Sequence, residues 1–234
     1  MSEEGPAGAE LPRDGADGAL PHDWVDRLAA VPATARPEDL SRFHPPAQGG
    51  RESAVLMLFG LGSDGAPPDV LLTQRADTMR SHAGQVSFPG GSLDPTDDGL
   101  VAAALREATE ETGLDPAGVD VLGELPALYL PPSGYVVTPV LALWREPSPV
   151  AAVDPAEVSR VVRVPLDELL DPANRCTARH PSGYLGPAFT VQGLFVWGFT
   201  AGLLSRVLAL AGLERPWVHD RVVALPADVL ALLP

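Results

Sequence analysis

The feature that most constrains the fold is a series of short apolar runs, each bounded by glycine, proline or polar residues. Runs of this length and composition predict strands. They lie at residues 52–61, 68–75, 84–91, 119–128, 135–144, 159–166 and 184–191. Helices are predicted at 100–112, at 166–171, and at 198–212, where Gly212 would close the helix. Because strands outnumber helices and do not alternate strictly with them, a mixed α/β or α+β layer fold is favoured over a regular doubly wound one.

The 234 residues suffice for one large domain with appendages. Residues 1–21 are rich in Gly, Ala, Pro and acidic residues, which predicts a disordered acidic tail. Residues 22–50 contain a predicted helix at His22–Val31 and a Pro-rich linker. The main domain is expected at 51–213, followed by an extension at 214–234 whose Val and Leu content predicts packing on the core.

Charge and hydropathy exclude several classes of protein. The net charge of −15 argues against a nucleic-acid-binding surface, and all sixteen basic residues are Arg, which excludes lysine-based chemistry. The N-terminus has neither the basic nor the apolar region of a signal peptide. The longest apolar run, 191–213, is interrupted by Gly and Arg206, so it is read as a strand end and a buried helix, not a membrane span. We expect a cytoplasmic protein without membrane or nucleic-acid partners; a homodimer is compatible with the sequence.

The single cysteine, Cys176, cannot form an intramolecular disulfide, which suits a reducing compartment. Its surroundings, DPANRCTARHPSG, predict a polar surface loop. A surface or half-buried thiol is therefore favoured over a nucleophile assisted by His180.

A glycine pattern, GLGSDG, matches a dinucleotide-binding fingerprint at Gly60, Gly62 and Gly65. That fingerprint must open a helix, whereas two prolines and another strand follow here. A hairpin-like loop is the better interpretation.

The stretch LREATEETGL, residues 105–114, concentrates three glutamates on little more than one helical turn. At about 100° per residue, Glu107, Glu110 and Glu111 share one face, and the apolar residues lie on the opposite face. A solvated acidic face is the simpler interpretation. The preceding small residues, the Gly-rich turn and the acid cluster of Asp94, Asp97 and Asp98 instead favour a site for Mg²⁺ or Mn²⁺.

REATEETGL also resembles the second half of the Nudix box, R-E-U-x-E-E-x-G-U, with Ala108 in the apolar slot. The Nudix hydrolase superfamily cleaves nucleoside diphosphates linked to another moiety, on an α/β/α sandwich with a mixed sheet between helices. The resemblance implies divalent-metal ligands and catalytic groups, a structural arginine and a closing glycine. These are Glu107, Glu110, Glu111, Arg106 and Gly113.

The first half of the box departs from the pattern G-x₅-E-x₇-R. Counting back from Arg106 puts Asp98 at the acidic position and Ser92 at the glycine. Counting forward from Gly91 reaches Asp97 and leaves a loop one residue longer. The structural role is assigned to Gly91 and Asp98, with Asp97 as the alternative.

The segment before the box, LLTQRADTMRSHAGQVSFPGG (71–91), resembles the one found in coenzyme A pyrophosphatases, with Ala76 in place of the usual Ser. The likeness extends over residues 52–213. It implies substrate-binding residues within this segment. They are Arg75, Arg80, Gly84, Phe88 and Gly90.

Planar arginine forks suit the phosphates of coenzyme A, although Arg75 and Arg80 could instead neutralise neighbouring acids. His82 is a candidate for phosphate contact or proton transfer, with a structural role as the alternative. Glycines such as Gly84 and Gly90 permit close approach of the backbone.

The reaction implied by the resemblance is attack of a metal-activated water on one phosphorus of coenzyme A or acyl-coenzyme A, giving 3′,5′-ADP and (acyl-)4′-phosphopantetheine. Glu111 is the first candidate for the general base and Glu157 the second. Two alternatives stay open: a Nudix hydrolase for another nucleoside diphosphate derivative such as ADP-ribose or NADH, and a silent module that only binds nucleotides.

Overall fold

A large mixed sheet forms the centre of the protein in the computed structural model, which describes residues 20–43, 45–46, 49–62, 66–79, 83–131 and 133–232. Its strands are β1 (Arg51–Gly60), β2 (Asp69–Arg75), β3 (Val86–Ser87), β4 (Gly90–Ser92), β5 (Val119–Glu124), β6 (Leu128–Leu130), β7 (Tyr135–Trp144) and β8 (Val158–Pro165). β1 runs parallel to β7 along its whole length and antiparallel to β2 and β4. β2 also pairs antiparallel with β3 and β8, so the predicted mixed sheet is confirmed.

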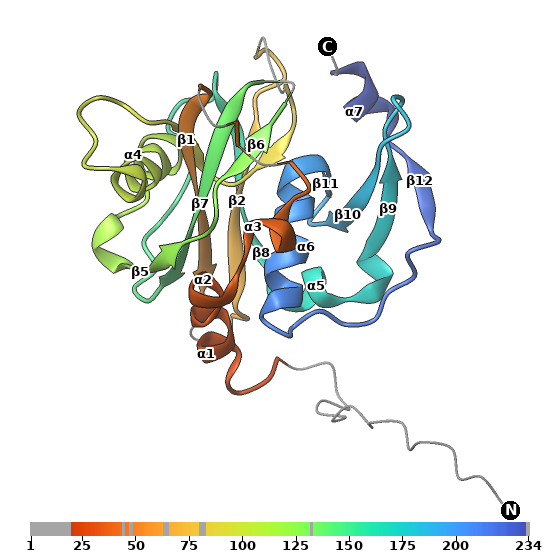
Figure 1. Cartoon of the computed structure of the whole chain (residues 1–234), viewed down its shortest axis with the longest axis horizontal. Coiled ribbons are helices and arrows are strands. Elements are labelled where there is room, and N and C mark those ends of the chain that lie inside the picture. The colour runs from red at the N-terminus through yellow and green to blue at the C-terminus, as the bar shows by residue number, and fades with distance from the viewer. Residues whose placement is uncertain are drawn as a thin grey trace, which may run out of the picture.

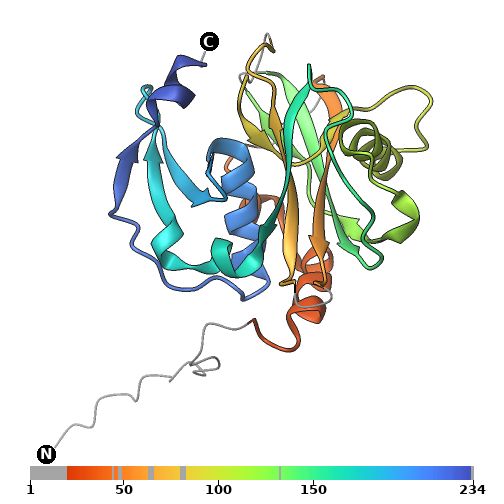
Figure 2. The same cartoon turned by 180° about the vertical axis from the view of Figure 1, so that it is seen from behind.

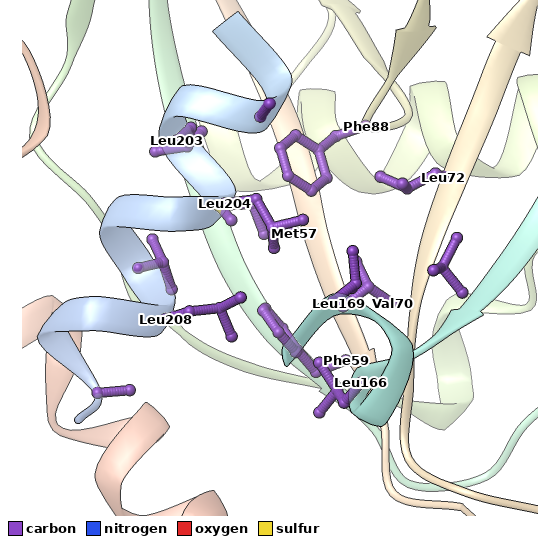
Figure 3. Packing of buried hydrophobic residues seen from close by; sticks show 14 of the residues in the cluster. Met57, Phe59, Val70, Leu72, Phe88, Leu166, Leu169, Leu203, Leu204 and Leu208 are labelled. Carbon is purple, nitrogen blue, oxygen red and sulfur yellow. The ribbon is translucent and has the colours of Figure 1, made fainter. Parts of the chain in front are cut away.

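Two helices, α4 (Leu100–Thr112) and α6 (Gly198–Leu210), cover opposite faces of this sheet (Figures 1 and 2). Side chains alternate along a strand, and β1 shows the consequence. Leu56 and Leu58 pack on the α4 side, and Met57 and Phe59 pack on the α6 side. Figure 3 shows Met57 beside Leu204 of α6. The expected α/β/α arrangement with a mixed sheet between helices is confirmed.

A second sheet of four strands lies beyond α6. It consists of β9 (Arg175–Arg179), β10 (Leu185–Val191), β11 (Leu194–Val196) and β12 (Val222–Ala224), in the order β11-β10-β9-β12. The prediction of a polar surface loop around Cys176 is wrong, since this residue lies in β9 and is 4% exposed. It packs with Ala178, Ala188 and Leu225, and this burial raises the pKa of its thiol. The sequence around Cys176 is only weakly apolar. In a strand, however, alternate side chains face the core, so a buried residue can have polar neighbours in the sequence.

Other boundaries differ from the sequence prediction in detail. The run 84–91 is divided between β3 and β4 rather than forming one strand. The predicted N-terminal helix is α1 (Trp24–Ala29) followed by α2 (Val31–Thr34), and α3 (Pro37–Leu40) lies in the expected linker. The remaining helices are α5 (Leu166–Leu170), α7 (Ala227–Ala231) and the 3-10 turns Pro116–Gly118 and Pro172–Asn174. Among the described residues, none of the helices has the length and apolar content needed to cross a membrane.

The chain after α6 is tied to the rest of the fold by a buried arginine. Arg175 of β9 is 1% exposed and contacts Glu214 through Nη1 at 2.8 Å and Ser205 through Nη2 at 2.6 Å. Its guanidinium lies over the rings of Phe189 and Trp217. Further along, β12 pairs parallel with β9. These contacts join residues of the C-terminal segment to the second sheet.

Candidate active site

The site is built on the face of α4 that lies opposite its apolar face and is partly covered by β4. The helix ends at Gly113, whose φ of +70° is a left-handed conformation suited to glycine at a helix C-terminus. Ala103, Ala104 and Ala108 are fully buried against the large sheet, and their small size lets the helix lie close to it. The predicted apolar face is confirmed, and it directs the three glutamates away from the core.

Arg106 organises the acidic groups around the start of the site. Its Nε and Nη2 donate to the two carboxylate oxygens of Asp97, both at 2.9 Å. Nη1 donates to Glu107 Oε1 and Glu110 Oε2, both at 3.0 Å, and Nη2 also donates to the Ser92 carbonyl at 3.1 Å. One guanidinium thus fixes the loop before α4 to the carboxylate face, and its contact with Glu110 joins residues four positions apart on the helix.

The acid that contacts Arg106 is Asp97, not the assigned Asp98. The Asp97 side chain is 5% exposed and accepts both arginine bonds, and Asp94 donates its backbone N–H to it. Asp98, by contrast, is exposed. The loop is therefore one residue longer than the general pattern, because the turn at Asp94 must close before the chain enters α4.

Two glycines let the strand approach the glutamates closely. A Cβ at Gly91 would lie 2.5 Å from the Glu107 carboxylate, so only a glycine leaves room for this side chain. The neighbouring Gly90 donates its N–H to Glu111 Oε2 at 3.2 Å. A Cβ at Gly90 would collide with the Ala54 carbonyl of β1. The two glycines thus hold Glu107 and Glu111 against β4.

Burial alters the acidity of the two inner glutamates. It raises the pKa of Glu111 to about 7, and the negative charges of Glu107 and Glu157 add to this. The Gly90 N–H and the charge of Arg75 oppose the increase but do not cancel it. The pKa of Glu107 is also raised, again mainly by burial. Both carboxylates are therefore costly to ionise unless a cation lies beside them.

The donor set fits a hard divalent cation, although the side chains do not form a closed cage. Among the residues that the structure describes, no three acidic, His or Cys side chains converge as a formed metal cluster. Arg106 bonds to one oxygen each of Glu107 and Glu110, and Gly90 bonds to one oxygen of Glu111. Each glutamate thus keeps a second oxygen outside these bonds. Carboxylate oxygens on a partly solvated face suit Mg²⁺ or Mn²⁺, because such a cation would neutralise the buried charges of Glu107 and Glu111.

Besides Gly90, Arg75 is the predicted substrate residue that acts on this site. It ends β2, and its charge lowers the pKa of Glu111, which places the guanidinium near the carboxylates. Its Nε is buried and has no hydrogen-bond partner among the described residues. A buried N–H without a partner is costly, and an anionic ligand would satisfy it. Arg80 and His82 lie outside the described residues.

Two other predicted substrate residues, Phe88 and Gly84, lie elsewhere. Phe88 is 2% exposed and points into the α6-side core near Met57 (Figure 3), so its prediction as a substrate contact is wrong. Gly84 adopts φ +63° and lies against the side chain of Leu232 near the C-terminus. A Cβ at Gly84 would collide with that side chain. An aromatic residue before Pro-Gly-Gly has the same sequence pattern whether it packs inward or outward, so only the tertiary structure separates these roles.

Both candidates for the general base belong to this site. The Glu157 carbonyl accepts the N–H of Ala76, directly after Arg75, and its carboxylate is exposed. Its charge raises the pKa of Glu111, so the two acids influence one another. His180, in contrast, bonds to Ser182 and stacks on Trp197, which leaves Cys176 without the base that a nucleophile requires.

A cavity of about 510 Å³ lies between the two sheets, and no sequence motif predicts it. Its walls come from β2, β10, β12 and α7. These segments are far apart in the chain and carry no shared motif.

A comparison with protein-family models matches residues 50–182 to the NUDIX domain. Among curated proteins, one from Cronobacter sakazakii, described as "Uncharacterized Nudix hydrolase NudL", is 45% identical over 156 residues, or 64% of this chain and 78% of the relative. Its counterpart in Escherichia coli O7:K1 is 43% identical over 154 residues, or 63% of this chain and 77% of the relative.

Among solved structures, a Nudix hydrolase from M. smegmatis, RenU, aligns with a TM-score of 0.50 and 19% identity. The alignment covers 74% of this chain and 92% of RenU. At this identity the likeness concerns the fold alone.

Proposed function

Because the chain belongs to the Nudix hydrolase family and is a hydrolase of pyrophosphate bonds, we propose that its substrate is coenzyme A or an acyl-coenzyme A. The observation that carries this proposal is the position of Arg75. The arginine comes from the segment 71–91 that resembles coenzyme A pyrophosphatases. Its charge lowers the pKa of Glu111, and its buried Nε lacks a partner among the described residues. A diphosphate held there would satisfy the arginine and lie within reach of the carboxylate face.

In the proposed reaction, the oxygen of a water molecule bonds to one phosphorus and the bridging P–O bond breaks. The bridging oxygen stays with the other phosphate, so the products are 3′,5′-ADP and (acyl-)4′-phosphopantetheine. A divalent cation held by Glu107, Glu110 and Glu111 would supply charge neutralisation and acidify the attacking water.

The chain's own groups have separate tasks in this proposal. Glu111 keeps Oε2 on the Gly90 N–H, which leaves Oε1 to accept the proton from the water. Arg106 keeps Glu107 and Glu110 on one face, and Arg75 orients the diphosphate. Glu157 remains the second candidate for the base.

We also propose that the hydrolase domain spans 51–213 and that 214–234 is an extension packed on it. The family match ends at residue 182. We extend the domain to residue 213 because β10, β11 and α6, which follow the match, contribute side chains to the same hydrophobic core as the large sheet. The contact of Arg175 with Glu214 and the pairing of β12 with β9 support the packing of the extension.

The proposal is tested with purified protein and Mg²⁺ or Mn²⁺, offered coenzyme A, acetyl-coenzyme A, ADP-ribose and NADH, with products resolved by chromatography. We expect cleavage of the coenzyme A substrates at kcat/KM at least about tenfold above the others, a difference of about 1.4 kcal/mol. Equal rates on ADP-ribose would refute the substrate, and no turnover of any of them would favour a silent nucleotide-binding module. Glu111→Gln is the inactive reference, and Glu146→Gln, an exposed glutamate away from α4, is the matched control.

A further inference from the structure

The cavity between the two sheets has the volume of a small-molecule site. Its roughly 510 Å³ falls within the usual range for ligand pockets, about 300–1,000 Å³. The residues proposed to bind the metal and the diphosphate do not line this cavity. The cavity is thus a separate space from the carboxylate face.

The cavity nevertheless begins next to the proposed phosphate site. Gln74 lines it, and the next residue in β2 is Arg75. The pairing of β2 with β8 is irregular between these two residues. Gln74 lines the cavity, whereas the charge of Arg75 acts on Glu111 of α4. A ligand that occupied both sites would have to cross from one face to the other at the end of β2, where Arg75 is the last residue.

The two sites lie on either side of one segment. Figures 1 and 2 both place the described chain after β2 between α4 and α7 along the long axis of the molecule. Gly84, which follows in this segment, accepts a hydrogen bond from Gln74 Nε2 at 3.3 Å and packs against Leu232. The C-terminal residues Val229 and Leu232 thus belong to the lining of the cavity beside this segment.

The charges of the lining argue against a phosphate inside the cavity. Among the described residues of the lining, Asp77 and Asp228 are two acids against one cation, Arg221, whose Nη1 already donates to the Ala173 carbonyl at 2.8 Å. A net negative lining repels an anion. Of the parts of a coenzyme A thioester, only the pantetheine arm is uncharged, because both the diphosphate and the adenosine carry phosphate.

The rest of the lining suits a chain of alternating amides and methylene groups. Gln74 and Thr190 offer polar side chains, and Val86, Phe195 and Val229 offer apolar ones. We propose that this cavity binds the pantetheine arm of coenzyme A and its thioesters while the diphosphate lies at Arg75 and the carboxylate face. The assignment rests on the proposed function and names the group that would separate coenzyme A from other nucleotides.

The test narrows the cavity and measures binding of the arm alone. Ala224 lines the cavity from β12 and is exposed, so Ala224→Trp adds bulk without entering the core. Ala227→Trp is the matched control, since this exposed alanine does not line the cavity. Binding of pantetheine, which carries no phosphate, is followed by calorimetry in metal-free buffer, and KM and kcat are measured with acetyl-coenzyme A and Mg²⁺. Thr190→Trp repeats the experiment from the opposite wall if Ala224→Trp lowers the melting temperature.

We expect pantetheine to bind the wild type and Ala227→Trp but not Ala224→Trp, and KM to rise at least about tenfold with kcat nearly unchanged. We also expect 3′,5′-ADP not to displace pantetheine. Unchanged KM and binding in both cavity variants, no binding to the wild type, or displacement by 3′,5′-ADP would each overturn the assignment. Cleavage of acetyl-coenzyme A without binding of pantetheine would refute the assignment of the cavity but not the proposed function. Binding of pantetheine without cleavage would refute the proposed function but not the assignment of the cavity.

Discussion

Replacing Glu111 with glutamine is expected to abolish turnover and, at the same time, to make the metal-free protein more stable above pH 7. The two effects have one cause, the burial of an ionised carboxylate between α4 and β4. Burial holds the pKa of Glu111 at about 7, against the ordinary 4.5 of a glutamate. When the pH rises through this window, the unfolded chain loses its proton first, so the folded state loses stability relative to it.

The size of the effect follows from that difference in pKa. At about 1.4 kcal/mol for each pH unit between 4.5 and about 7, the ionised carboxylate costs the fold at most about 3.5 kcal/mol above pH 7. Below the unfolded pKa the cost disappears, because both states are protonated. Glutamine keeps an oxygen that can accept the Gly90 N–H and carries no charge, so it removes the cost at every pH.

The assay is thermal unfolding in EDTA at pH 8 and pH 4, for the wild type, Glu111→Gln and the exposed control Glu146→Gln. At pH 8 we expect Glu111→Gln to gain about 1–3 kcal/mol, a Tm increase of about 3–10 °C for a domain of this size. At pH 4 the gain should fall to a few tenths of a kcal/mol. Added Mg²⁺ should raise the Tm of the wild type but not of Glu111→Gln. A variant that is less stable than the wild type at pH 8, or equally stabilised at both pH values, would refute the reasoning.

Three further substitutions test the groups around Glu111. Gly91→Ala places a Cβ about 2.5 Å from the Glu107 carboxylate, so we expect kcat/KM to fall about 10–100-fold while the circular dichroism spectrum is retained; normal activity would show that Glu107 can move without loss. Arg106→Lys replaces a guanidinium that holds three carboxylates with a single ammonium, and we expect Mg²⁺ affinity, measured by calorimetry, to fall about 10–100-fold. Glu214→Gln leaves Arg175 buried without a full counter-charge and should cost about 3 kcal/mol in urea unfolding, largely recovered by adding Arg175→Met; additive losses in the double variant would contradict this.

The parts of the site that could be predicted from sequence depend on local geometry. A helix places residues at positions i, i+3 and i+4 on one face whatever it packs against, so the common face of Glu107, Glu110 and Glu111 follows from spacing alone. The contact between Arg106 and Glu110 follows from the same rule. The apolar runs predict strands because a pleated strand needs one buried side.

The choice between Asp97 and Asp98 could not be made in this way, because it depends on how the loop turns at Asp94 before α4. The inward orientation of Phe88 also depends on a distant element, namely α6. A third example is Cys176, whose polar neighbours suggest a surface loop although its strand is covered by residues that lie more than ten positions away in the chain.

The sequence by itself determined the mixed α/β architecture, the acidic face of one helix and the arginine that orders it, since each rests on periodicity or on contacts within a few residues. Only the tertiary structure decided which acid meets Arg106, which of the predicted substrate residues act on Glu111, and that a cavity opens between the two sheets. These outcomes depend on side chains from separate segments meeting in space. Such meetings are set by the packing of whole layers, which no single stretch of sequence contains.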